Sequence, residues 1–335
     1  MVLHREVAKA PELALAIGST LLDLLTPVRA ELALVDARIE RATDTDQPQL
    51  TEAFATLLAG GKRLRPALAL LSAGEDRAGS REVVALGAAL EMLHTATLIH
   101  DDIVDGADLR RGRPTMASLH GRDAALLAGD HLFARAAVVV TETGDLEALR
   151  VFAQTLVTIS AGELAQVWRQ SRLPSLEEYL SLIYAKTACL FESATLGGAL
   201  LAGRKREEVQ RFADYGRNLG LAFQIADDVL DYAGDAAVMG KPTQNDLKRG
   251  LLTLPVLLYV WEHPDWASRE LPSSVPQRTV RRVVRAVLEG GFVEKAREMA
   301  RDYAERARES VSGLAGGEYA TSLEGLAYFA SERVA

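Results

Sequence analysis

The chain has 335 residues, of which 48% are hydrophobic, with 38 Lys and Arg against 46 Asp and Glu. A chain of this length can bury about 75% of its extended surface, so its core needs no covalent staple. The single cysteine, Cys189, excludes an intrachain disulfide and a cysteine-based zinc site. The net charge of −8 argues against a general nucleic-acid-binding protein, because phosphate neutralisation needs a net basic face.

No run reaches the roughly eighteen uncharged apolar residues that a membrane-spanning helix requires. The N-terminal run is only weakly apolar and contains Glu6. We therefore expect a cytoplasmic protein without a transmembrane segment.

Apolar residues recur at intervals of three and four along the chain, which predicts an all-α fold. Proline and glycine are confined to short segments, so no linker divides the chain. We expect one domain over residues 1–335, with residues 1–45 as a peripheral N-terminal helix. The predicted helices cover residues 12–41, 48–59, 64–73, 81–105, 115–119, 123–142, 145–170, 176–203, 206–232, 251–261, 277–290, 292–312 and 319–333.

The predicted helix over 81–105 is apolar on nearly all sides, can begin at Ser80 as N-cap, and ends in the sequence HDDIVD. Asp101 and Asp105 are four residues apart and share a helix face, with Asp102 beside them. Carboxylates gathered at the negative end of a helix dipole repel one another, and Mg²⁺ relieves that repulsion. A solvated acidic helix end is the simpler alternative, and the apolar body of the helix argues against it.

The predicted helix over 206–232 ends in the same way, with Asp227, Asp228 and Asp231 preceded by Gln224 on the same stripe. The two acidic groups have identical spacing and lie 126 residues apart (227 − 101). One such group is weak evidence. Two of them indicate that they face each other across a cavity and hold metal jointly.

Basic residues that suit phosphate lie near these motifs. Lys62 and Arg65 occupy the sequence GGKRLRP at a predicted loop-to-helix entry, where free backbone N–H groups also favour an anion. Arg110 and Arg111 follow the first acidic motif and can contact phosphate in bidentate fashion. A solvated basic turn and charge compensation of the neighbouring acids are the respective alternatives.

Four further residues are weaker candidates from spacing alone. Lys186 and Thr187 lie in an otherwise apolar helix, where a lysine most often reaches out to solvent. Lys241 follows a turn at Gly240. His94 lies seven residues before Asp101, about 10 Å along the same helix face, where it is either a core residue or a hydrogen-bond donor to diphosphate.

The set GGKRLRP, HTATLIHDDIVD, DLRRGRPT, KT, GLAFQIADDVLD and GKPTQNDLKRGLLTLP resembles the trans-isoprenyl diphosphate synthase (polyprenyl synthetase) family. The first aspartate string is most similar to medium- and long-chain members. The resemblance implies a single-domain helical bundle of the isoprenoid synthase type with a central cavity, and a homodimer. It also implies that Mg²⁺, as three ions with diphosphate bound, is ligated by Asp101, Asp105 and Asp227.

By the same resemblance, the catalytic residues are Asp101, Asp102, Asp105, Asp227, Asp228 and Lys186, with Asp231 assisting. Isopentenyl diphosphate would be held by Lys62, Arg65, His94 and Arg111. The allylic diphosphate would be held by Arg110, Lys186, Thr187, Gln224 and Lys241. The reaction implied is ionisation of the allylic substrate followed by head-to-tail (1'–4) condensation, with no enzyme nucleophile.

Product length depends on the slot that runs back along the first aspartate helix, lined by Leu93, Ala96 and Thr97. Ala96, five residues before Asp101, stands where short-chain members have Phe or Tyr, which predicts a medium- or long-chain all-trans product. Such a product makes transient membrane contact at release plausible. One departure from the family is Leu251, where many members have lysine; Lys248 or Arg249 would substitute for it.

The alternatives are a short-chain (C15 or C20) synthase, a class I terpene cyclase and a non-catalytic partner subunit. A cyclase would not need Lys62, Arg65, His94 and Arg111, and its cavity would be rich in aromatic residues. A non-catalytic subunit would be expected to lose one aspartate motif, and this chain keeps both. A hydrolase is disfavoured because no general base lies beside either motif.

Overall fold

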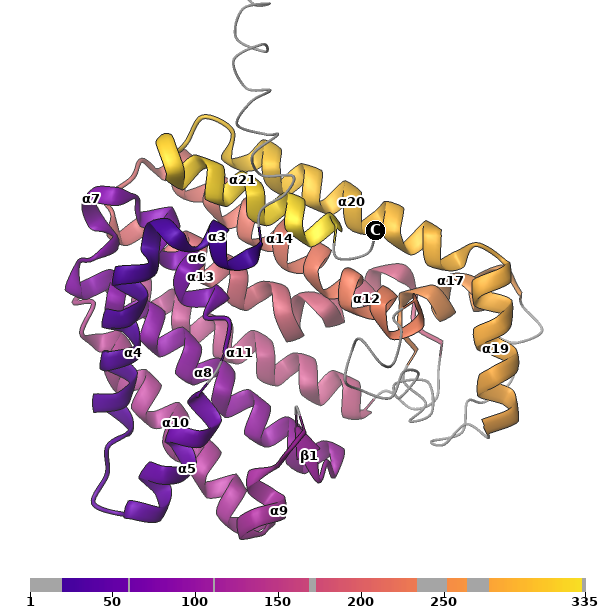
Figure 1. The fold of residues 1–335 in the computed structure, drawn as a ribbon, viewed down its shortest axis with the longest axis horizontal. Helices are drawn as coiled ribbons and strands as arrows, with labels where there is room; N and C mark the ends of the chain where they lie inside the picture. The colour runs from indigo at the N-terminus through magenta and orange to yellow at the C-terminus, as the bar shows by residue number, and fades with distance from the viewer. Residues whose placement is uncertain are drawn as a thin grey trace, which may run out of the picture.

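Helices make up nearly all of the chain that the computed structural model describes, which is residues 20–59, 61–110, 112–168, 173–233, 252–263 and 277–332 (Figure 1). The first half contains α3 (Leu21–Leu24), the 3-10 turn η1 (Thr26–Val28), α4 (Arg29–Thr43), α5 (Pro48–Leu58), α6 (Leu64–Ala73), α7 (Glu75–Ala78), α8 (Arg81–Asp105), α9 (Met116–His120) and α10 (Arg122–Thr141). The second half contains α11 (Leu146–Trp168), α12 (Leu176–Ile183), the π-helical turn η2 (Tyr184–Ala188), α13 (Cys189–Leu201), α14 (Arg206–Ala233), α17 (Leu254–Glu262), α19 (Gln277–Glu289), α20 (Phe292–Val311) and α21 (Gly317–Glu332).

The all-α prediction is confirmed, and the sequence missed several local features. The predicted helix over 12–41 is interrupted, because Pro27 lies in the 3-10 turn η1 between α3 and α4; residues 12–19 lie outside the described part. The predicted helix over 176–203 contains the π-helical turn η2. The strands β1 (Leu109–Arg110) and β2 (Arg113–Pro114) pair antiparallel just after α8, around Gly112 with φ 75°.

Helix α8 lies at the centre of the larger hydrophobic core, where it packs against α4, α6, α10 and α13. Its N-terminus is capped by Ser80, whose Oγ accepts a hydrogen bond from the Val83 N–H. Its C-terminus ends at Gly106, which adopts the left-handed conformation with φ 60° that ends many helices. These two caps set the 25-residue length of α8 and place its aspartates in the last turn.

The segments that precede α8 and α14 are in contact. Arg204, two residues before α14, donates a hydrogen bond of 3.0 Å from Nε to the carbonyl of Ser72, near the end of α6 and nine residues before α8. In Figure 1 both helices run from the side of α7 toward the opposite side of the molecule. Their acidic C-terminal turns therefore lie toward the same side.

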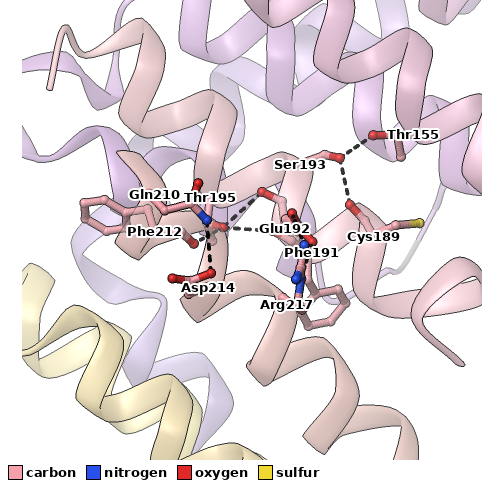
Figure 2. A network of polar contacts seen from close by, with 10 residues as sticks. All are labelled: Thr155, Cys189, Phe191, Glu192, Ser193, Thr195, Gln210, Phe212, Asp214 and Arg217. Atoms are coloured by element: carbon pink, nitrogen blue, oxygen red, sulfur yellow. Dashed lines mark hydrogen bonds and ion pairs between the residues drawn. The ribbon is translucent and has the colours of Figure 1, made fainter. Parts of the chain in front are cut away.

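Polar contacts fix α13 between α11 and α14 (Figure 2). On one side, the hydroxyls of Ser193 and Thr155 contact each other. On the other side, Thr195 donates a hydrogen bond of 2.6 Å to the carbonyl of Phe212, and Arg217 makes a bidentate ion pair with Glu192. Because η2 leads directly into α13, these contacts also fix the position of the π-helical turn.

Two helices are long and apolar enough to cross a membrane by length and composition alone. In α8, 78% of the most apolar 18-residue stretch is buried inside the fold, and in α10 the buried share of such a stretch is 39%. The burial of α8 marks it as a core helix of this fold.

Candidate active site

The first aspartate motif places three carboxyls in three different environments at the end of α8. Asp102 is 3% exposed and accepts a hydrogen bond of 2.8 Å from Nε of Arg110 in β1. Asp105 is exposed. Asp101 is partly buried, and burial raises its pKa to about 6, against a lowering effect of Lys186; the carboxylates of Glu163 and Asp105 raise the pKa further.

The three carboxyls of the second motif, at the end of α14, also differ in burial. Asp228 is 6% exposed and accepts hydrogen bonds from the Tyr179 hydroxyl (2.7 Å), the Leu254 backbone N–H (3.3 Å) and Nε2 of Gln224 (3.1 Å). Asp227 is exposed and Asp231 is partly buried. In both motifs the middle carboxylate therefore binds protein donors, while the first and last share another helix face.

The predicted Lys186-Thr187 pair lies in the π-helical turn η2, between two glycine contacts. A Cβ on Gly162 of α11 would lie 2.5 Å from the Ala185 side chain, and a Cβ on Gly220 of α14 would lie 2.5 Å from the Ala188 Cα. Since real Cβ atoms do not approach so closely, only glycine at these positions lets both helices pack directly on the turn. Such π-helical turns are frequent at functional sites.

The turn η2 connects the two aspartate motifs. Toward α8, the charge of Lys186 acts on the carboxyl of Asp101, since it lowers the pKa of that carboxyl. Toward α14, the hydroxyl of Thr187 donates a hydrogen bond of 2.7 Å to Oε1 of Gln224, whose amide in turn contacts Asp228. An exposed lysine and a hydroxyl of one turn are thus linked to carboxylates from two distant parts of the sequence.

The donor set fits Mg²⁺. Burial raises the pKa of Asp101, and the carboxylates of Glu163 and Asp105 add to that rise against the lowering effects of Lys186 and Arg110, so a bound cation would stabilise the ionised form. Among the described residues, no three His, Cys, Asp or Glu side chains form a complete metal cage. Mg²⁺ usually takes one or two carboxylates, with phosphate oxygens and water completing its shell, so this arrangement suits a metal that arrives with diphosphate.

The residues of the GGKRLRP sequence lie around the start of α6. Lys62 precedes the helix and lines an apolar cavity of about 450 Å³ together with Thr20, Leu21, Leu22, Leu25 and Phe329. The Arg65 guanidinium lies 5.4 Å from the centre of the Phe191 ring in α13, a cation–π contact. His94 is partly buried in α8.

The remaining predicted residues divide into buried core positions and positions outside the described residues. Leu93 and Ala96 are fully buried in the core around α8, and Thr97 is partly buried. Cys189 is buried, and this burial raises the pKa of its thiol to about 12. The positions outside the described part of the chain are Arg111, Lys241, Lys248, Arg249 and Leu251.

The sequence reasoning missed several groups that shape this site. Tyr179 in α12 and the N–H of Leu254 in α17 donate hydrogen bonds that hold Asp228 in place. The negative charge of Glu163 in α11 raises the pKa of Asp101. Tyr179 carries no motif of its own. The Ser175 capping box, which fixes the start of α12 one turn earlier, is the only local signal near Tyr179 in the described chain.

Comparison with known proteins gives the family. The polyprenyl synthetase family model matches residues 47–287. The chain belongs to the polyprenyl synthetase family. It is therefore a prenyl-transferring enzyme, as the sequence resemblance predicted.

Individual relatives match nearly the whole chain. Octaprenyl diphosphate synthase of Escherichia coli (strain K12) is 35% identical, covering 90% of this chain and 96% of that protein. Short chain isoprenyl diphosphate synthase of Methanothermobacter thermautotrophicus is also 35% identical, covering 93% and 99%. The crystal structure of polyprenyl synthase from Caulobacter crescentus, complexed with calcium and isoprenyl diphosphate, is 36% identical and matches with a TM-score of 0.86 over 94% of this chain and 98% of that chain.

Proposed function

We propose that this enzyme condenses isopentenyl diphosphate with an allylic prenyl diphosphate and releases a medium- or long-chain all-trans polyprenyl diphosphate. The observation that carries the proposal is the linkage of the two aspartate motifs through η2. Lys186 acts on Asp101 at the end of α8, and Thr187 reaches Asp228 through Gln224 at the end of α14. A single diphosphate between these groups would meet carboxylates, a cation and a hydroxyl donor.

In the proposed site, Asp101, Asp105 and Asp227 would hold Mg²⁺, as three ions when diphosphate is bound. The bound metal would supply positive charge to the departing diphosphate. Lys186 and Arg110 orient that diphosphate, and the Thr187 hydroxyl, which donates to Gln224 in the structure, would turn its O–H to the diphosphate in the complex. Asp102 and Asp228 position neighbouring side chains through hydrogen bonds, Asp102 with Arg110 and Asp228 with Gln224. Arg111 and Lys241 are assigned diphosphate contacts by resemblance only.

Isopentenyl diphosphate is held by Lys62, Arg65 and His94 at the start of α6 and on α8. When the allylic C–O bond breaks, its electron pair leaves with the diphosphate and a delocalised carbocation remains. The double bond of isopentenyl diphosphate attacks C1 of that cation, and the new chain loses a proton to the departing diphosphate. The enzyme contributes no nucleophile, so its work is orientation and charge stabilisation.

The product grows along α8, past Thr97, Ala96 and Leu93. Relatives with octaprenyl and with short-chain names match this chain at the same identity, so product length rests on these side chains. Ala96 is small and fully buried. A small residue here leaves room for a chain longer than C20, whereas a short-chain product is the alternative outcome.

We further propose that the enzyme is a cytoplasmic homodimer of single-domain chains. Large hydrophobic side chains are exposed along α10 and α11: Leu126, Leu127, Val138, Leu146, Val157, Leu164, Val167 and Trp168. An exposed apolar face of this kind is typical of an interface that a second copy covers. Tyr184 packs against both hydrophobic cores, which supports one domain. Release of a long product would involve transient membrane contact.

Product analysis of the purified enzyme tests the proposal. The enzyme is incubated with Mg²⁺, farnesyl or geranylgeranyl diphosphate and labelled isopentenyl diphosphate, and the dephosphorylated products are separated by chain length. We expect a series that ends beyond C20. Products that stop at C15 or C20 would establish the short-chain alternative, cyclic hydrocarbons without incorporated label would indicate a cyclase, and no turnover would contradict the proposed condensation.

A further inference from the structure

Arg63, in the middle of GGKRLRP, has an unusual backbone. Its φ is 49° and its ψ is 34°, and no other non-glycine residue of the described chain has a positive φ. A residue with a Cβ adopts this left-handed conformation only where its surroundings hold it there. The strained residue lies between Lys62 and Arg65, both of which are assigned to isopentenyl diphosphate.

The Arg63 side chain supplies the contacts that hold this conformation. Nη2 donates a hydrogen bond of 2.7 Å to the carbonyl of Leu58, the last residue of α5, where helix carbonyls lack partners. Nε donates to Oδ1 of Asp36 in α4 at 2.7 Å, and Nη1 donates to Oε1 of Glu91 in α8 at 3.3 Å. One guanidinium group therefore ties the loop to α4, α5 and α8.

Glu91 anchors this arrangement in the core. It is 5% exposed, and a buried carboxylate is strongly unfavourable without a cationic partner. The loop folds directly over the pair, since a Cβ on Gly61 would lie 3.3 Å from both Nη1 of Arg63 and Oε1 of Glu91. Only a residue without a side chain fits there without pushing the pair apart.

Glu91 is also one turn before His94 on α8, so the two side chains are neighbours on that helix. The contact between Arg63 and Glu91 thus brings three diphosphate-binding candidates into register: Lys62 before Arg63, Arg65 two residues after it, and His94 three residues after Glu91. The Arg63 side chain is 15% exposed and its donors are engaged within the protein, so it does not itself face a substrate.

We infer that Arg63 and Glu91 are positioning residues for the isopentenyl diphosphate site. They act through Lys62, Arg65 and His94, and they leave the allylic site at η2 unaffected. The inference rests on the proposed function. A purely structural role would instead lower stability without separating the two substrates.

The test uses Arg63→Gly and Arg63→Ala, with steady-state KM values for both substrates and calorimetric titration with isopentenyl diphosphate alone. Glycine accepts the positive φ, so Arg63→Gly removes the guanidinium without the backbone strain that Arg63→Ala adds. We expect Arg63→Gly to raise KM and Kd for isopentenyl diphosphate by about tenfold to a hundredfold, as small misplacements of binding groups do, with KM for the allylic substrate unchanged. Glu91→Gln should shift the same two constants by a smaller factor, because the amide oxygen still accepts from Arg63.

Arg38→Ala is the matched control. Arg38 in α4 forms a half-buried ion pair with Glu142 at the end of α10, which also joins distant helices but does not touch the loop. It should lower the melting temperature and leave both KM values unchanged. An unchanged KM for isopentenyl diphosphate in folded Arg63→Gly, or equal rises in KM for both substrates, would overturn the inference and leave the proposed function standing. A wild-type enzyme that neither binds nor condenses isopentenyl diphosphate would overturn the proposed function with it.

Discussion

Thr187 and Gln224 form a hydrogen bond of 2.7 Å that joins the π-helical turn η2 to α14. The Gln224 carbonyl oxygen accepts from the Thr187 hydroxyl, and its amide nitrogen donates to Asp228 at 3.1 Å. One amide thus links the hydroxyl beside Lys186 to the second aspartate motif. The geometry of the allylic site depends on this link.

Thr187→Val keeps the shape of the side chain and removes the hydroxyl. We expect KM for the allylic diphosphate to rise by about tenfold, because one hydrogen bond to a charged ligand contributes roughly 1.5–3 kcal/mol. KM for isopentenyl diphosphate should stay unchanged. Thr187→Ser, which keeps the hydroxyl, should restore most of the activity in the same steady-state assay, and equal kinetics for the valine and serine variants would contradict the role of the hydroxyl.

Tyr179→Phe removes one donor from the buried carboxylate of Asp228. Burial, together with the negative charge of Asp228, raises the Tyr179 pKa well above 10, so the hydroxyl stays protonated and donates. We expect a loss of about 1–3 kcal/mol in unfolding free energy, measured by urea denaturation, and a lower kcat. Tyr319→Phe is the control, since its hydroxyl makes only a long contact of 3.4 Å to Pro27. Equal small losses for the two variants would count against a special role for Tyr179.

Much of this site could be predicted from sequence, because helical spacing alone places Asp101 with Asp105 and Gln224 with Asp227. The different roles of the carboxylates within each motif could not be predicted. That Asp102 and Asp228 bind protein donors depends on Arg110, Tyr179 and Leu254, which come from three other elements. Short-range patterns carry no information on which distant donor reaches a given carboxylate.

The helix break at Lys186 was also beyond sequence pattern. The apolar spacing of residues 176–203 predicts one continuous helix, while the π-helical turn inserts an extra residue within it. The turn is selected by packing, through close contacts to Gly162 and Gly220 on neighbouring helices. The positive φ of Arg63 has the same kind of origin, in contacts to Asp36 and Glu91.

The raised pKa of Asp101 predicts a pH dependence of stability in metal-free protein. The folded-state pKa is about 6, against an ordinary value of 3.8. As the pH rises from 4 to 6 the unfolded chain releases this proton first, so the contribution of Asp101 to stability is lost over that window. Asp101→Asn cannot ionise and should be more stable than wild type above pH 6, by up to about 3 kcal/mol.

Thermal unfolding of both proteins in EDTA between pH 4.5 and 7.5 measures this difference. Asp44→Asn, which changes an exposed carboxylate far from the motif in sequence, provides the baseline. Millimolar Mg²⁺ with pyrophosphate should reverse the order of the two proteins at pH 7.5, since only wild type retains the ligand. A difference that does not change with pH would show that Asp101 is not perturbed as described.

Ala96→Phe should shorten the product. The side chain at position 96 is fully buried on α8, five residues before Asp101, and a phenyl ring there would fill the proposed path of the growing chain. The same change overpacks the core and should cost about 1–3 kcal/mol in stability. Ala96→Val is the control of intermediate size, and chromatography of the dephosphorylated products should give lengths in the order Ala, Val, Phe. An unchanged length in folded Ala96→Phe would place the path elsewhere.

The central claim is that the two aspartate motifs hold one diphosphate together with Mg²⁺. An allylic diphosphate analogue whose carbon–oxygen bond does not break can be titrated calorimetrically into the enzyme, with and without Mg²⁺. The titration of wild type, Asp101→Asn and Asp227→Asn tests this claim. We predict one Mg²⁺-dependent binding site per chain. Either substitution should raise the Kd for the analogue at least about tenfold, since each removes a charged ligand of the same complex. If either substitution left the affinity and the number of sites unchanged, the two motifs would not share a ligand.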